Sequence, residues 1–178
     1  MANKGLDKNG RPVYEGNFPH GTPKAAKHRR ILRLIQDVWS KKPLPLDIRE
    51  PDGTTRRIEA RFDPAYDPDN PRAPTDASKL MAGNRHGTSK DQRVTLDLAD
   101  DWYEIAKGAA YNYSKPEDGK ASPTHSNVRI WHYFVNDILF REYGQVEAAP
   151  YRVTINVKER DDGTFVYSIS AENSKKRA

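Results

Sequence analysis

The strongest structural signal in the chain is a hairpin pattern near its carboxyl end, in the segment "YRVTINVKERDDGTFVYSIS". Apolar and polar residues alternate along its first half, which assigns them to opposite faces of a strand: Tyr151, Val153, Ile155 and Val157 against Arg152, Thr154, Asn156 and Lys158. The Asp162-Gly163 pair that follows is typical of a tight turn between antiparallel strands. The chain is therefore expected to fold around an antiparallel sheet that packs one face on a core.

A second hairpin is predicted in the first half of the chain. The segments "LPLDIRE" and "TRRIEARFD" flank a Pro-Asp-Gly turn, and their apolar residues alternate in the same way: Leu44, Leu46 and Ile48, then Ile58, Ala60 and Phe62. Residues 63–82, which follow, hold four prolines and several acidic residues. That composition is typical of a long surface loop.

Residues 23–41 predict an amphipathic helix that begins at Pro23 and is capped by Thr22. Apolar residues recur in it at helical spacing: Ile31, Leu34, Ile35, Val38 and Trp39. Its other face is basic, with Lys24, Lys27, Arg29, Arg30 and Arg33. Such a face is either solvated or follows the phosphates of a nucleic acid, and in the second case Arg29 and Arg30 are the candidate contacts.

The middle of the chain predicts a short strand followed by a long helix. Val94 and Leu96 alternate in "DQRVTLDL", and Asp97 can cap a helix whose apolar stripe runs from Leu98 to Tyr113. We expect this helix to be the principal one packed on the sheet. Residues 128–140 fit a helix by spacing and a buried strand by their aromatic and β-branched content, and we favour the strand.

Length and composition fit an α+β fold, with a twisted antiparallel sheet on one principal helix and an N-terminal helical extension. At 178 residues the chain can build one ordinary core. We expect residues 1–42 to form a linker and the basic helix, and residues 43–178 to form the main domain. No apolar run approaches the roughly 20 residues of a membrane span, and residues 1–20 lack the apolar segment of a secretory signal.

The net charge and the absence of several known motifs reduce the number of functions that the chain can have. The net charge of +5 favours anionic partners, and the lack of cysteine excludes disulfides, thiolate metal sites and cysteine nucleophiles. There is no phosphate-cradling glycine loop, no dinucleotide-binding glycine motif and no nucleophile elbow. The five histidines do not have metalloprotease spacing, so we predict neither a metal nor a cofactor.

Metal-free acid–base chemistry remains. Cleavage of RNA by its own 2′-hydroxyl group needs a base, an acid and cations near the phosphate. Histidine suits both proton roles because its pKa lies near neutrality, and the candidates are His86, His125 and His132. Candidate phosphate contacts near them in sequence are Arg85, Lys90 and Arg129. For His132 and for Tyr167 on the last hairpin, the alternative is a packing role in the core.

The polar face of the last hairpin is expected to line the same cleft as these histidines. Its residues are Arg152, Thr154, Asn156, Lys158, Ser168 and Ser170.

Three segments resemble the small nuclease superfamily of barnase, EndoU, colicin-type tRNases and RelE: "DQRVTLDLADDWYEIAKGAAYNYS", "WHYFVND" and "YRVTINVKERDDGTFVYSIS". More narrowly, residues from about 43 to 172 resemble a branch found at the C-terminal ends of bacterial polymorphic toxins, including contact-dependent growth inhibition effectors, and in large phage-associated proteins. The resemblance covers some two-thirds of the chain.

The resemblance implies a metal-independent ribonuclease toxin, commonly one that cleaves tRNA. Such a domain is secreted as the tail of a larger polypeptide, acts in the target-cell cytoplasm and is neutralised by a cognate immunity protein. Separately, we expect the chain to be a monomer. By the resemblance, His86, His132 and Tyr167 occupy places comparable to those of the catalytic residues. We expect His86 or His125 to be the base, His132 the acid or base and Tyr167 a positioning hydroxyl. From their nearness in sequence, Arg85 and Arg129 are expected to contact the phosphate. The last strand has Tyr167-Ser168 where a further histidine would be expected, which leaves the acid open.

Two functions of other classes stay open. A non-enzymatic nucleic-acid-binding module would use the basic helix and the basic C-terminal residues, and its binding would depend steeply on salt. An interaction domain associated with phage or secretion would instead dock a protein partner through aromatic surfaces and have no measurable affinity for RNA.

Overall fold

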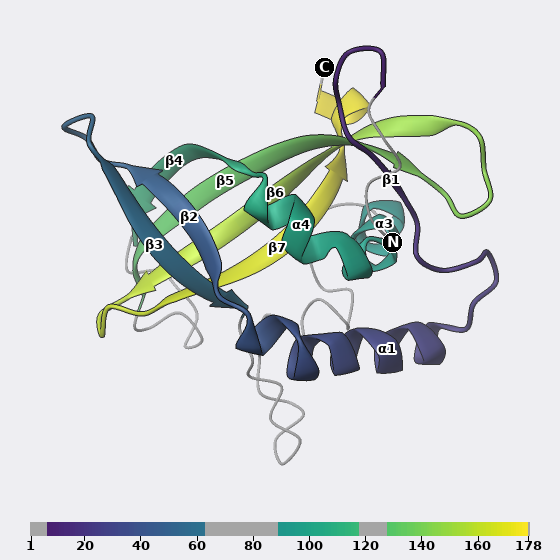
Figure 1. Ribbon diagram of the computed structural model, residues 1–178, viewed down its shortest axis with the longest axis horizontal. Helices are drawn as coiled ribbons and strands as arrows, with labels where there is room; N and C mark the ends of the chain where they lie inside the picture. The colour runs from purple at the N-terminus through teal and green to yellow at the C-terminus, as the bar shows by residue number, and fades with distance from the viewer. Residues whose placement is uncertain (1–6, 63–88, 118–127, 178) are drawn as a thin grey trace.

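The computed structural model describes residues 7–62, 89–117 and 128–177, and the chain has an α+β fold (Figure 1). The α-helices of this part are α1 (Lys24–Asp37), α3 (Ser89–Asp97) and α4 (Trp102–Lys107). The strands are β1 (Val13–Glu15), β2 (Leu44–Arg49), β3 (Thr55–Phe62), β4 (Ala110–Pro116), β5 (Val128–Arg141), β6 (Ala148–Arg160) and β7 (Phe165–Asn173). They form one curled sheet in the order β1-β5-β6-β7-β3-β2, and β4 also pairs with β5.

The centre of the sheet is the antiparallel run β5-β6-β7. Phe134 pairs with Ile155, and Ile155 pairs with Ile169, so these three buried residues define the inner face of the sheet. Gly163 has a φ of 82° in the turn from β6 to β7, a conformation that glycine adopts without steric cost. The predicted last hairpin and the strand predicted at residues 128–140 are both confirmed.

The sheet is mixed: the predicted antiparallel pairing is present in β4-β5-β6-β7 and in β2–β3, but two further pairs are parallel. β1 pairs in parallel with the end of β5, and β3 pairs in parallel with β7 through Arg61 and Phe62. Neither pair is joined by a hairpin, so turn chemistry does not fix the direction of these strands. The predicted β2–β3 hairpin is present, with Leu46 opposite Ile58.

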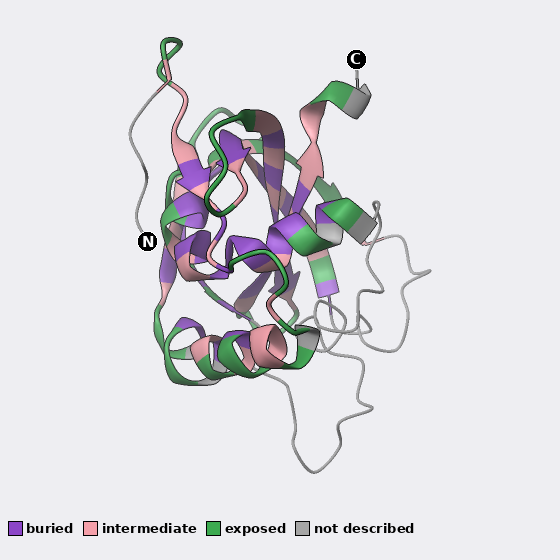
Figure 2. Ribbon diagram, turned by 90° about the vertical axis from the view of Figure 1, so that its right-hand side faces the viewer, coloured by how far each residue is buried: buried purple, intermediate pink, exposed green. Residues whose placement is uncertain are grey.

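α1 confirms the amphipathic helix predicted at residues 23–41. Ile31, Ile35 and Trp39 are buried in the common core, and Trp39 begins a short 3₁₀ turn, η1 (Trp39–Lys41). Figure 2 shows the exposed outer side of α1 and the buried residues gathered between the helices and the sheet. The predicted cap is wrong, because the Thr22 hydroxyl donates to the Pro19 carbonyl at 2.7 Å and Pro23 is the N-cap residue.

The strand predicted at "DQRVTLDL" is wrong, because this segment forms α3. Asp91, Val94, Thr95 and Leu98 are all buried and follow one another at helical spacing. Because Asp91 and Thr95 are polar, the apolar stripe of this helix is interrupted in the sequence. The alternation of Val94 and Leu96 therefore favoured a strand that does not form. The Thr95 hydroxyl donates to the Asp91 carbonyl at 2.9 Å and accepts from the Ala171 amide of β7 at 3.0 Å, which docks α3 on the sheet.

The long helix predicted from Leu98 to Tyr113 is also wrong. A 3₁₀ turn, η2 (Ala99–Asp101), leads into the six-residue α4, and the chain then becomes β4. Ala109 and Ala110 are compatible with the apolar stripe of a helix, but alanine at these positions does not demand a helix. Tyr113 instead stacks on Tyr133 of β5, with ring centroids 4.5 Å apart. Cross-strand aromatic pairing therefore outweighs helix propensity here.

The remaining N-terminal and C-terminal segments join the same body. Tyr14 and Phe18 are buried, and residues after β7 form the short turn η4 (Ser174–Arg177). The loop predicted at 63–82 lies outside the described residues. No helix in the described part of the chain has the length and apolar character needed to cross a membrane.

Candidate functional site

The candidate site lies where the apolar inner rows of the strands give way to polar residues. His132 lies two residues before Phe134 in β5, and Glu159 lies two residues after Val157 in β6. Because side chains on a strand alternate between faces, both point to the inner face. Both are buried, with 2% and 1% of their surface exposed. Arg56 of β3 reaches Glu159 from the opposite hairpin, with Nη2 2.8 Å from Oε1.

Four side chains from three adjacent strands form one hydrogen-bonded chain. The Tyr111 hydroxyl lies 2.8 Å from Ser114 Oγ, and Ser114 Oγ lies 2.6 Å from His132 Nδ1. His132 Nε2 lies 3.0 Å from Glu159 Oε1. Ser114 is directly opposite His132 in the β4–β5 register, so the sheet itself holds the hydroxyl against the imidazole.

Glu159 is the fixed negative charge of this chain. Burial alone would raise the pKa of its carboxyl, but hydrogen bonds from Arg129, Arg56 and His132 outweigh burial and lower the pKa to about 2. Arg129 Nη2 bonds to Oε2, whereas Arg56 and His132 both reach Oε1. Glu159 therefore stays ionised at neutral pH and can only accept hydrogen bonds.

Because the Glu159 carboxylate is ionised, it determines which atoms of the hydrogen-bonded side chains carry protons. Burial lowers the pKa of His132 below its ordinary value of 6.5, although the contact with Glu159 opposes the shift, so His132 is neutral at neutral pH. We place its proton on Nε2, which donates to Glu159, and this leaves Nδ1 to accept from the Ser114 hydroxyl. Ser114 Oγ then accepts from the Tyr111 hydroxyl. The Ser114 hydroxyl, the His132 base and the Glu159 carboxylate that orients this base are thus joined by successive hydrogen bonds.

Three of these hydrogen-bonded side chains, those of Tyr111, Ser114 and His132, line a pocket of about 350 Å³, here called the His132 pocket. Its polar lining residues come from the β2–β3 hairpin, β4 and β5: Arg49, Glu50, Arg56, Tyr111, Ser114, Lys115 and His132. Glu50 pairs with Arg56 at 2.6 Å, so three cations face one carboxylate and one neutral histidine. The excess positive charge suits an anionic group.

The structure brings some of the predicted site residues together. His132 is at the centre, and Arg129 joins it through Glu159. Tyr167 lies on the same inner face but is fully buried; its ring edge meets Phe62, and its hydroxyl has no hydrogen-bond partner among the described residues. Tyr167 is therefore a core residue outside the hydrogen-bonded chain.

The other predicted contacts do not line this pocket. Lys90 is at the start of α3, and Arg29 and Arg30 are on α1, where Arg30 pairs with Asp100 at 2.5 Å. The predicted residues Arg85, His86 and His125 lie outside the described residues.

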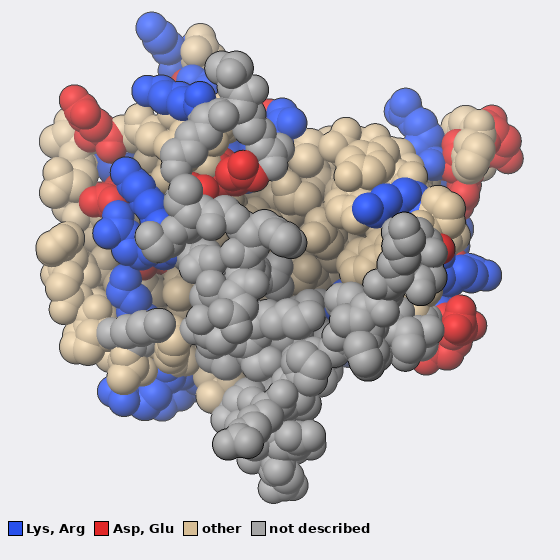
Figure 3. All heavy atoms as spheres, turned by 180° about the vertical axis from the view of Figure 1, so that it is seen from behind, with Lys and Arg blue, Asp and Glu red and all other residues tan. Residues whose placement is uncertain are grey.

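The expectation that the polar face of the last hairpin shares a cleft with His132 is wrong. Arg152, Thr154, Asn156 and Lys158 alternate with the inner residues of β6, so they point to the face opposite His132. Arg152 pairs there with Asp137 at 2.8 Å. In the view from behind, Lys and Arg atoms are interspersed with Asp and Glu atoms over the coloured part of the surface (Figure 3).

Four residues of the hydrogen-bonded network were not predicted, and neither were the pocket residues Arg49, Glu50 and Lys115. The four are Arg56, Tyr111, Ser114 and Glu159. Glu159 continues the inward alternation of Val153, Ile155 and Val157, and a carboxylate in that position is the signal that could have found it. Arg56 continues the inward row of Ile58 and Ala60 in the same way. Tyr111 was placed in the predicted helix and Ser114 in the loop after it, so their pairing with β5 could not be anticipated.

Within the described ranges, no group of three or more His, Asp or Glu side chains is arranged to hold a metal ion. No protein-family model matches the chain, and neither the curated proteins nor the solved structures contain a significant match to it.

Proposed function

We propose that the chain is a metal-independent ribonuclease and that the His132 pocket is its active site. The observation that carries the proposal is the line from Tyr111 through Ser114 and His132 to Glu159, which ends in a pocket with excess positive charge. A neutral histidine held by a carboxylate is a suitable proton acceptor at neutral pH. The cations beside it suit the charge of a phosphodiester in the transition state.

In the proposed reaction, the 2′-hydroxyl of the substrate attacks the adjacent phosphorus. Its proton passes to Ser114 Oγ while Ser114 gives its own proton to His132 Nδ1, because both ring nitrogens of His132 already have protein partners. The leaving 5′-oxygen takes a proton from the Tyr111 hydroxyl. Return of the His132 proton through Ser114 to Tyr111 restores the site and leaves a 2′,3′-cyclic phosphate.

The charged residues of the pocket have separate roles in this proposal. Arg56 bonds to Glu159 and Glu50, yet about 40% of its side chain is exposed, so it can also face a phosphate. Lys115 and Arg49 line the same pocket and supply further positive charge. Arg129 acts on the other side of Glu159, where it keeps the carboxylate ionised.

The proposal is tested by incubating purified chain with bacterial RNA in the presence of a chelator. Wild-type protein should give fragments that end in cyclic phosphate, and Ser114→Ala and His132→Gln should each lower the rate by about 100-fold or more. His20→Ala is the matched control, because His20 is exposed and outside the site. Rates of both site variants equal to wild type, with thermal unfolding lowered, would assign the chain of hydrogen bonds to the core instead.

The same assay tests the residues that lie outside the described ranges. His86→Ala and His125→Ala should slow cleavage if either histidine supplies a second proton-transfer group, as the resemblance to the nuclease superfamily implies. We further propose tRNA as the substrate, a cognate immunity protein as the partner and the cytoplasm of a target cell as the place of action. Co-expression with the protein encoded by a neighbouring gene should then relieve growth inhibition.

A non-catalytic nucleic-acid-binding function is the second candidate, and it is favoured by a separate observation. A hollow on the outer side of α1 is lined by Arg29, Arg30 and Arg33, with Asp37 as the opposing charge. In this case Arg29→Glu and Arg33→Glu should weaken RNA binding and reduce its salt dependence, while His132→Gln should leave binding unchanged. Nitrocellulose filter binding at several salt concentrations separates the two functions.

A further inference from the structure

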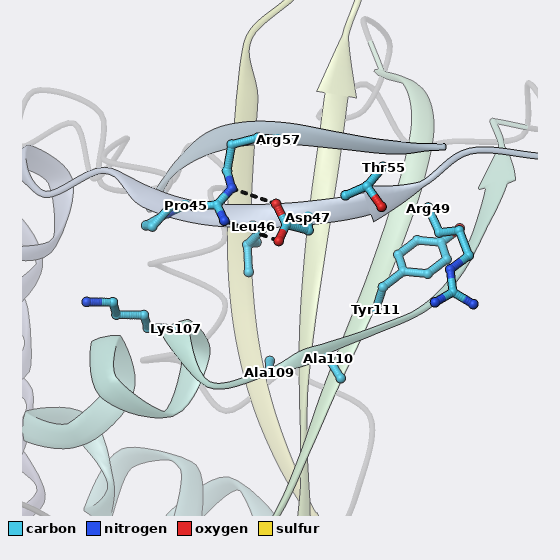
Figure 4. Close-up of a pocket in the computed structure, with 10 residues that line it drawn as sticks. All are labelled: Pro45, Leu46, Asp47, Arg49, Thr55, Arg57, Lys107, Ala109, Ala110 and Tyr111. Atoms are coloured by element: carbon cyan, nitrogen blue, oxygen red, sulfur yellow. Dashed lines mark hydrogen bonds and ion pairs between the residues drawn. The ribbon is translucent and has the colours of Figure 1, made fainter. Parts of the chain in front are cut away.

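A second pocket adjoins the His132 pocket and shares two residues with it. This pocket of about 440 Å³, here called the Lys107 pocket, lies between β2 and the segment that joins α4 to β4 (Figure 4). Arg49 and Tyr111 line both pockets, so the two are adjacent along the hairpin and are together called the groove here.

The groove follows two strand edges that come close to each other without pairing. Among the described residues, β2 pairs with β3 alone and β4 with β5 alone, so each presents a free edge to the groove. The free edges supply main-chain donors and acceptors, and the side chains between them supply charge. An extended chain of some kind fits this shape better than a compact ligand.

We infer that the groove holds a single strand of RNA, with the phosphodiester to be cut in the His132 pocket. The Lys107 pocket then holds the next nucleotide along the strand, beyond the two that this bond joins. This inference rests on the proposed function and adds the form of the substrate and a second binding site. Each pocket falls within the roughly 300–1,000 Å³ range of small-molecule sites, which suits one nucleotide and is too small to enclose a duplex.

The charge of the Lys107 pocket favours a nucleic acid over a peptide strand. Its cations are Arg49, Arg57 and Lys107, and its one carboxylate, Asp47, pairs with Arg57 at 2.5 Å. In the described part of the chain, no ion pair joins Arg49 or Lys107 to a carboxylate. Their charges are thus available to phosphate groups, which bind basic side chains through charge-assisted hydrogen bonds.

The arrangement of the Lys107 pocket suits a base between two phosphates. In Figure 4, Lys107 lies at one end, and Arg49 lies beside the Tyr111 ring at the other. Ala109 and Ala110 form a small apolar floor between them, which leaves room for a flat ring against Tyr111. Stacking of a base on an aromatic side chain is tolerant of sequence and contributes substantially to single-strand binding.

The experiment compares two substrates that differ only in length. A dinucleoside monophosphate occupies the cleaved bond alone, whereas a single strand of about 12 nucleotides also fills the Lys107 pocket. Lys107→Glu reverses the charge of that pocket, and Ala110→Trp fills it; both should lower the ratio of kcat/KM for the strand to kcat/KM for the dinucleotide by about tenfold. Lys8→Glu is the matched control because Lys8 is exposed and lines neither pocket.

A ratio that is unchanged in both variants would overturn the inference, provided that their unfolding midpoints equal that of the wild type. If the wild-type chain cleaves neither substrate, the proposed function is wrong, and a binding measurement then tests separately whether the groove holds a single strand. A 2′-O-methyl strand, followed by fluorescence anisotropy, should then bind more tightly than its duplex and lose about tenfold in affinity in Ala110→Trp. Equal binding of strand and duplex would overturn the inference and favour an extended peptide along the free strand edges.

Discussion

Glu159 is a carboxylate that stays charged inside the molecule because three donors surround it. Arg56 and His132 approach one oxygen and Arg129 the other, which compensates for the loss of water around the group. The same contacts fix the proton of His132 on Nε2. At the scale of single residues, the stability of the fold and the proposed chemistry therefore depend on one buried charge.

Replacement of Glu159 by Gln should lower the free energy of unfolding at neutral pH by about 1–3 kcal/mol, because the amide cannot satisfy both arginines. The pKa of Glu159 is lowered from 4.5 to about 2 in the folded chain, so its contribution is present above about pH 4.5 and is lost as pH falls toward 2. Urea unfolding from neutral to acidic pH should show this loss in the wild type and a flatter profile in Glu159→Gln. Glu147→Gln is the control, since Glu147 is exposed, and a wild-type acid profile retained in Glu159→Gln would contradict the assignment.

The pH dependence of cleavage should follow His132. Because the proposed base is the neutral imidazole and its pKa is lowered, the rising limb of kcat/KM against pH should have its midpoint below 6.5. Initial rates with the dinucleoside monophosphate measure the free-enzyme pKa directly. A midpoint at or above 6.5 would mean that another group controls the rate.

The folded state also favours neutral His132 over the charged form, which sets the sign of its effect on stability. A histidine with a lowered pKa binds fewer protons when folded, so its contribution is complete above pH 6.5 and declines as pH falls below that value. His132→Gln should remove this part of the acid sensitivity.

At the scale of elements, α3 shows how a helix can be hidden in a sequence. Its buried face includes Asp91 and Thr95, whose polar groups are satisfied by the main chain, so a search for apolar spacing finds only Val94 and Leu98. The hairpins were predicted because their turns and alternation are local signals. The helix that docks on β7 was missed because its signal depends on tertiary partners 76 or more residues away.

Thr95→Val should destabilise the chain by about 1–3 kcal/mol, because it keeps the shape of the side chain and leaves the Ala171 amide without its acceptor. Thr95→Ser retains the hydroxyl and should lose less. Chemical denaturation measures both. Amide hydrogen exchange at Ala171 gives an independent reading, and equal protection in the valine variant and the wild type would contradict the role of Thr95.

At the scale of the whole molecule, the helix placed in the N-terminal extension shares one hydrophobic core with the sheet. Ile31, Ile35 and Trp39 belong to the same buried cluster as Ile155 and Ile169. The class of the fold could be predicted from composition and hairpins, but the curl of the sheet could not. The parallel pairings of β1 with β5 and of β3 with β7 leave no local trace in the sequence.

Ile35→Ala should lower the free energy of unfolding of the entire chain by about 2–5 kcal/mol, because Ile35 is fully buried. Val38→Ala is the matched control at the C-cap of the same helix; Val38 is 42% exposed, and the substitution should change stability by less than about 0.5 kcal/mol. Far-ultraviolet circular dichroism and tryptophan fluorescence should report one shared transition. Separate transitions for the two signals would contradict a common core.

The pairing of early strands with late ones has a consequence for synthesis on the ribosome. Glu15 meets Arg141 across 126 positions, and Arg56 meets Glu159 across 103. The β2–β3 hairpin can form soon after it emerges, but it has no place to dock until β7 has left the exit tunnel. Glu159 gains its last partner only at that stage, so a nascent chain would lack the proposed activity until β7 has emerged from the ribosome.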